Sequence, residues 1–223
     1  MRRRYLLVSL SVSLSVYLSA LLGLSACSLP GARTQAIQYF VLEVPAPASA
    51  PPVAVAKAGH TLPVLLLRDA EASVFTQNPR LIYSRSPSTR AYYQYALWTE
   101  SPPKRLHTLL RQRLLASGLY AGVVPLGAGV QGDYQLNFRL LEFFHNAAQT
   151  PGLALVKLDA ELVERGSARL IAQQAFVAEV PLASQDAAAA AIGLGQASSQ
   201  TLDAMLTWLA RVQPNSVITP QAR

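Results

Sequence analysis

The sequence predicts an α+β domain, in which a mostly antiparallel sheet carries two main helices on one face and an N-terminal signal segment precedes the domain. Several stretches alternate apolar and polar residues, which is typical of strands with one buried face. Two longer stretches have helical spacing instead. The chain has 223 residues, 51% of them hydrophobic, which excludes a disordered chain and suits a single domain. Its single cysteine excludes a disulfide scaffold and a cysteine-based zinc site.

The first 26 residues have the pattern of a secretory signal. Arg2, Arg3 and Arg4 form a basic start, and residues 5–24 are an uncharged stretch of mainly Leu, Val, Ser and Ala. A transmembrane helix is the alternative, but five serines dilute the apolar character of this stretch. Without residues 1–26 the formal net charge falls from +7 to +4, because three arginines and no acidic residue are lost.

The basic residues of the mature chain do not predict a nucleic-acid partner. They are scattered singly, apart from one local group that consists of Lys104, Arg105, Arg111 and Arg113. On a helix such a group is expected to form a solvated face.

Four strands are predicted in the first half of the mature chain. They cover residues 35–44, 62–69, 80–84 and 91–98, which are rich in aliphatic and aromatic side chains. Residues 45–52 contain four prolines, so we expect a loop there.

The first helix is predicted to follow these strands. Ser101 is its expected N-cap, Pro102 suits its first turn, and Gly118 can end it. One apolar stripe of this helix is expected to pack inward; it consists of Leu106, Leu109, Leu110 and Leu114.

The second half repeats the strand pattern and ends in a long helix. Strands are predicted at residues 134–140, 154–162 and 170–178, with a turn at Gly166 between the last two. The helix is predicted over residues 185–212.

Both ends of this helix have sequence signals, and its first half has a weak point. Ser184 is the expected N-cap, and Asp186 lies in the first turn, where the helix dipole favours an acid. Gly193 and Gly195 each lower helix stability by about 1 kcal/mol relative to Ala, so we expect a kink or break there. Residues 213–223 are predicted to be a disordered tail.

Catalytic and metal-binding patterns are not found in the sequence. His60, His107 and His145 have no second ligand at helical spacing and are expected to be solvated surface residues. The glycines of residues 127–132 have the spacing of a nucleotide-binding loop, but a strand rather than a helix is predicted to follow them, so we expect a flexible loop. The sequence therefore predicts no enzyme, no catalytic residue, no metal and no cofactor.

Aromatic residues are densest between positions 83 and 98, and two interpretations stay open. In the first interpretation, these side chains only fill the core between the sheet and the helices. In the second, those on the other face of the strands form an exposed contact surface for a partner or a lipid. The candidate contact residues are Tyr83, Tyr93, Tyr95 and Trp98.

The end of the signal segment resembles the lipobox of bacterial lipoproteins. Its residues are Leu24, Ser25, Ala26 and Cys27. This resemblance implies cleavage before Cys27 and acylation of that residue, which anchors the chain in a membrane. Ser28 follows instead of the Asp that is associated with inner-membrane retention, which favours the outer membrane. Residues 27–36 are then the lipidated N-terminus and a short tether.

Three segments together resemble the ABC-type transport auxiliary lipoprotein family. They are the lipobox, RLIY at 80–83 and YYQYALWTESP at 92–102. That family includes the paraquat-inducible protein C type lipoproteins, and the resemblance spans residues 39–209, within a predicted domain at 37–212. It implies an outer-membrane lipoprotein that faces the periplasm of a Gram-negative bacterium. Its partner would be the Mce-domain protein of an Mce-type ABC system that moves phospholipid or other hydrophobic molecules.

Two alternatives to this function remain open, a lipid-binding periplasmic carrier and a structural envelope lipoprotein. A homo-oligomer, for example a ring of subunits, is an open alternative to a monomer.

Overall fold

The structure, a computed structural model, describes residues 35–45, 53–56, 62–212 and 216–219. Ile37–Arg223 is a compact unit, and the whole hydrophobic core lies within it, so this unit contains the contacts on which its folding depends. The predicted signal peptide, Cys27 and most of the tether lie outside the described residues, as does most of the proline-rich segment. No helix among the described residues is long and apolar enough to cross a membrane.

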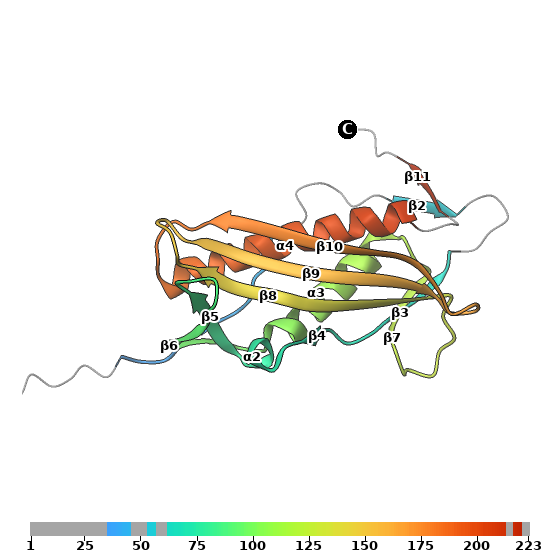
Figure 1. Cartoon of the computed structure of the whole chain (residues 1–223). Coiled ribbons are helices and arrows are strands. Elements are labelled where there is room, and N and C mark those ends of the chain that lie inside the picture. The colour runs from blue at the N-terminus through green and yellow to red at the C-terminus, as the bar shows by residue number, and fades with distance from the viewer. Residues whose placement is uncertain (1–34, 46–52, 57–61, 213–215, 220–223) are drawn as a thin grey trace, which may run out of the picture. The chain divides into compact units, whose positions relative to one another are not determined.

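One sheet of nine strands dominates the described residues (Figure 1). Its main path runs β1-β6-β5-β8-β3-β7, while β9 pairs with β8, β10 pairs with β9, and β4 pairs with β8. The strands are β1 (Gln38–Phe40), β3 (Val64–Leu67), β4 (Glu71–Ala72), β5 (Arg80–Ser84), β6 (Ala91–Trp98), β7 (Gly122–Pro125), β8 (Tyr134–Asn146), β9 (Leu153–Glu164) and β10 (Arg169–Pro181). A separate pair joins β2 (Val53–Ala56) to β11 (Ser216–Thr219).

The sheet is mixed, and the prediction of a mostly antiparallel sheet is wrong. Among the described strands, five of the eight pairings in this sheet are parallel, although the three longest strands, β8, β9 and β10, are antiparallel neighbours. The short strands β3, β4 and β5 all run parallel to β8. Long connections allow such parallel neighbours, as between β3 and β7, which are separated by a helix.

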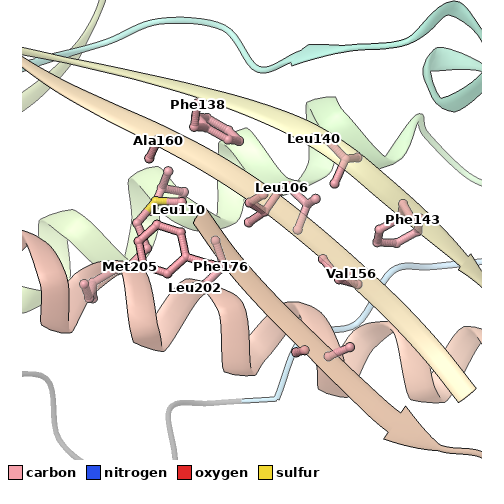
Figure 2. Packing of buried hydrophobic residues seen from close by; sticks show 14 of the residues in the cluster. Leu106, Leu110, Phe138, Leu140, Phe143, Val156, Ala160, Phe176, Leu202 and Met205 are labelled. Atoms are coloured by element: carbon pink, nitrogen blue, oxygen red, sulfur yellow. The ribbon is translucent and has the colours of Figure 1, made fainter. Parts of the chain in front are cut away.

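Two main helices cover one face of the sheet, which confirms the predicted α+β class. Helix α3 (Pro102–Ser117) and helix α4 (Ala187–Val212) lie behind the long strands in Figure 1, and a short helix, α2 (Val74–Gln77), precedes β5. Figure 2 shows the core between helices and strands. It contains Leu106, Leu110, Leu202, Met205, Phe138, Val156 and Phe176.

Helix α4 is unbroken through Gly193 and Gly195, so a break at these glycines, one of the two expected outcomes, does not occur. Both glycines are buried, and they allow close approach rather than flexibility. A Cβ at Gly195 would lie 2.1 Å from the carbonyl oxygen of Glu43, and one at Gly193 would lie 2.3 Å from the Leu182 side chain. The N-cap is Asp186 rather than Ser184, because Asp186 Oδ1 accepts the backbone N–H of Ala189 at 2.9 Å.

Helix α3 begins and ends as predicted, with Pro102 in its first turn and Gly118 in the left-handed conformation after it. Its basic residues are not all solvated, however. Arg113 is only 9% exposed; it pairs with Asp203 of α4 and donates to the carbonyl oxygen of Pro45. The sequence pattern missed this because Asp203 lies 90 residues away along the chain.

Several smaller elements were not predicted. Strand β7 and the short elements β4 and α2 lie in stretches with no periodic pattern, and β8 extends six residues beyond its predicted end to Asn146. In the turn between β9 and β10 the positive φ belongs to Ala168, at 53°, and not to Gly166. Within the predicted tail, Ser216–Thr219 forms β11, and residues 213–215 and 220–223 lie outside the described residues.

Candidate functional site

The four aromatic residues singled out in the sequence do not form one surface. Trp98 is 2% exposed and packs edge to face against Phe143 with ring centroids 5.9 Å apart, so it belongs to the core. Tyr83 and Tyr93 contact each other with ring centroids 5.0 Å apart. Tyr95 is partly exposed on β6, between the exposed Gln94 and the buried Ala96, and by alternation it shares a face with Leu97. A contact role for Tyr95 stays a prediction.

Tyr93 is tied to a histidine that is buried rather than solvated. His145 is 0% exposed, and its Nδ1 lies 2.7 Å from the hydroxyl of Tyr93. Its Nε2 is buried and has no hydrogen-bond partner among the described residues. Burial raises the pKa of Tyr93 to about 12 and lowers the pKa of His145, against the opposing effect of Asp186 on that histidine. The predicted surface position of His145 is therefore wrong, because the strand extends to this residue and turns it inward.

His107 is also not a free surface residue. Its ring stacks on Phe138 with centroids 6.3 Å apart, and its Nε2 lies 3.7 Å from a carboxylate oxygen of Asp69. Burial lowers the pKa of His107, although Asp69 acts in the opposite direction. His60 lies outside the described residues. In the described part of the chain, no three His, Cys, Asp or Glu residues gather as a metal site would require.

An apolar stripe lies on the outer side of the edge strand β1. Ile37, Tyr39 and Val41 are 52%, 65% and 51% exposed, and we call them the β1 stripe. Tyr39 pairs in register with Leu97 of β6, so the stripe continues onto Leu97 and Tyr95. No contact role was predicted for this stripe. Its sequence signal is that residues 37–42 carry apolar side chains on both faces of the strand.

A second apolar surface is a groove on the face opposite α3 and α4, which we call the outer groove. Its volume is about 410 Å³, and it lies where the turn between β5 and β6 meets β8, β9 and β10. Phe144, Leu155 and Val177 form its floor, and Arg90 and Lys157 border it. This groove was not predictable from the sequence, because residues from four strands and a turn form it.

The outer groove has a fixed ion pair at one side. The guanidinium carbon of Arg90 lies 3.9 Å from the ring centroid of Phe144, and Arg90 Nη2 donates to Glu142 Oε2 at 3.0 Å. Together with the β1 stripe, the groove gives the described residues two surfaces suited to contacts with apolar groups.

Comparisons with known proteins agree with this fold. A family model described as an ABC-type transport auxiliary lipoprotein component matches residues 40–206. A crystal structure of protein XCC0632 from Xanthomonas campestris is similar, with a TM-score of 0.68 and 23% identity over 78% of this chain and 96% of that chain. A crystal structure of an uncharacterized protein has a TM-score of 0.58 and 13% identity over 78% of this chain and 99% of that chain. No curated protein matches the chain.

Proposed function

Because the chain belongs to the ABC-type transport auxiliary lipoprotein family, we propose that it is a lipid-anchored accessory of an Mce-type ABC transport system that moves phospholipid or other hydrophobic molecules. The observation that carries this proposal is the family match over residues 40–206, which includes almost every strand of the main sheet and most of α4. The family has an auxiliary transport role, so we propose no enzymatic activity for this chain.

The proposed anchor is Cys27, exposed as the new N-terminus by cleavage after Leu24, Ser25 and Ala26. Ser28 supports sorting to the outer membrane, with the folded unit on the periplasmic side. Residues 27–36 would then link the acyl chains to β1 as a tether.

The proposed contact with the Mce-domain protein is the β1 stripe, extended by Tyr95 and Leu97. This surface directly follows the tether, and β1 has one free edge, since it pairs only with β6 among the described strands. Exposed aromatic and aliphatic side chains that are contiguous on a surface are typical of protein interfaces. The same surface is also open to a second copy of the chain, as in a ring of subunits.

The experiment is the recovery of partners from cross-linked envelope with the full chain tagged at its C-terminus. We expect an Mce-domain protein to be recovered with the wild-type chain and its recovery to fall at least tenfold with Tyr39→Asp, because a buried carboxylate costs several kcal/mol at an apolar interface and each 1.4 kcal/mol lowers the affinity about tenfold.

The matched control is Val130→Asp, since Val130 is 49% exposed in the loop after β7 and outside the β1 stripe. This variant should recover the Mce-domain protein as the wild type does. If the wild-type chain recovers no Mce-domain protein, the proposal is contradicted. If Tyr39→Asp recovers as much Mce-domain protein as the wild type, the contact surface is not the β1 stripe.

A further inference from the structure

The floor of the outer groove consists of side chains that face away from the core. Phe143, Val156 and Phe176 point toward the helices, so their neighbours Phe144, Leu155 and Val177 point to the opposite face. Val177 is 58% exposed, which is unusual for an apolar residue in the middle of a long strand. The floor is therefore apolar, and Leu155 and Val177 are reachable from solvent, whereas Phe144 is only 7% exposed.

Most polar groups around this floor already have partners. Arg90 pairs with Glu142 at 3.0 Å, and the hydroxyl of Ser84 donates to two carbonyl oxygens of the turn between β5 and β6. Asn146 Oδ1 accepts a backbone N–H of the loop that follows β8. Lys157 is the exception, because it forms no hydrogen bond or ion pair with any described residue.

The strand register fixes the backbone position of Lys157 at the border of the groove. In the antiparallel register it lies opposite Glu142 of β8 on one side and opposite Val177 of β10 on the other. Glu142 Oε2 accepts from Arg90, so Arg90, Glu142 and Lys157 together carry one net positive charge beside the groove. The groove thus combines an apolar floor with a lysine that forms no direct ion pair with a described side chain.

We propose that the outer groove binds one acyl chain that carries an anionic head group. The acyl chain lies on Phe144, Leu155 and Val177, and the carboxylate or phosphate of the head pairs with Lys157. The inference deepens the proposed transport role and rests on it for the source of the ligand, while the site itself depends only on the geometry of the groove.

Two observations favour a lipid over a peptide. The groove lies on a sheet face, where the backbone groups of β8, β9 and β10 already bond to each other, so an extended peptide would find no backbone partners. An acyl chain needs none. The volume of about 410 Å³ is also within the range of small-molecule sites.

A second hollow of about 470 Å³ adjoins the groove and shares Pro87, Arg90, Glu142 and Phe144 with it. The pair of Arg90 and Glu142 therefore stands between two hollows.

The test measures binding to the unit Ile37–Arg223, which contains the whole core. The probes are myristoyl lysophosphatidylglycerol, myristoyl lysophosphatidylcholine and myristate, each below the concentration at which it forms micelles, with native mass spectrometry and calorimetry as readouts. We expect the two anionic probes to bind, and the zwitterionic phosphatidylcholine probe to bind about tenfold more weakly. Tighter binding of myristate than of the phosphatidylglycerol probe would indicate a free fatty acid as the source.

Two variants of the groove make the test specific. Lys157→Gln should lower binding of the phosphatidylglycerol probe to the level of the phosphatidylcholine probe, about tenfold. Val177→Asp places a carboxylate beside Lys157 and should abolish binding of all three probes. The matched control is Leu170→Asp, because Leu170 is 50% exposed on the same strand but outside the groove, and it should bind like the wild type.

The inference is overturned if the three probes bind equally well, if none binds, or if Val177→Asp binds like Leu170→Asp. Loss of Mce-domain recovery in Val177→Asp, with unchanged binding of the probes, would make the groove a protein contact instead. If no probe binds but the Mce-domain protein is still recovered, the groove inference fails and the proposed function stands. If the probes bind but no Mce-domain protein is recovered, the proposed function fails and the lipid site in the groove stands.

Discussion

At the scale of single residues, burial disfavours the protonated form of His145 and His107. It lowers the pKa of both below the ordinary value of 6.5. Between about pH 7 and pH 5 the unfolded chain therefore binds protons that the folded chain does not, so the folded state loses stability as the pH falls. Each histidine contributes a slope of at most about 1.4 kcal/mol per pH unit.

This pH dependence can be measured with His145→Gln, His107→Gln and the double variant. Urea unfolding of the unit Ile37–Arg223 at pH 7, 6 and 5 should show the steepest loss for the wild type and the smallest for the double variant. The slope is the readout, because the loss of the contact with Tyr93 lowers the stability of His145→Gln at every pH. A double variant with the wild-type slope would show that these histidines do not carry the effect.

Residue positions were predictable from the sequence only in part. Alternation predicted that one part of the aromatic residues of β6 fills the core and another part is exposed, but it did not assign Trp98, a predicted contact residue, to the buried part. A bulge between β5 and β6 shifts the register, which places Tyr93 beside His145. Such contacts depend on strand pairing, which local patterns do not determine.

At the scale of elements, the glycines of α4 set how closely the helix approaches the chain after β1. Gly195→Ala should raise helix propensity by up to about 1 kcal/mol, yet the added methyl group would lie 2.1 Å from the backbone oxygen of Glu43. Overpacking of this kind costs about 1–3 kcal/mol, so we expect a net loss of stability in urea unfolding.

Gln196→Ala is the matched control, because Gln196 is the exposed neighbour of Gly195 in the same helix. It should be neutral or slightly stabilising. A Gly195→Ala protein that is more stable than the wild type would mean that Glu43 moves away without cost.

The existence of the long elements was predictable, and their pairing was not. Helix α3 with its Pro102 and Gly118 signals, and strands β5, β6, β8, β9 and β10, follow from periodicity and turn residues. Strand β7 has only four residues, and its place beside β3 depends on a contact more than 50 residues away. Short strands carry too little pattern to be recognised alone.

At the scale of the whole molecule, the proposed lipid anchor predicts where the chain resides. Cys27→Ala, expressed behind a signal peptide that ordinary signal peptidase removes, should fold normally and appear in the soluble fraction after a carbonate wash. Lipidation at two or more chains is needed for stable anchoring, and this variant has none. The control is Ser28→Ala, which keeps the cysteine and should stay in the membrane pellet. If the Cys27→Ala protein also stays in the membrane pellet, the proposed anchor is contradicted.

The central position of β8 has a consequence for folding kinetics. β3, β4 and β5 all take β8 as a partner, and the contact between Val64 and Asp133 closes a loop of 69 residues. A chain that crosses a membrane from its N-terminus delivers these three strands first and leaves them without their common partner until β8 emerges. Non-local pairing of this kind slows folding by several orders of magnitude relative to helical bundles. For the proposed exported chain, slow pairing of this kind would leave time for processing at the N-terminus before the sheet collapses.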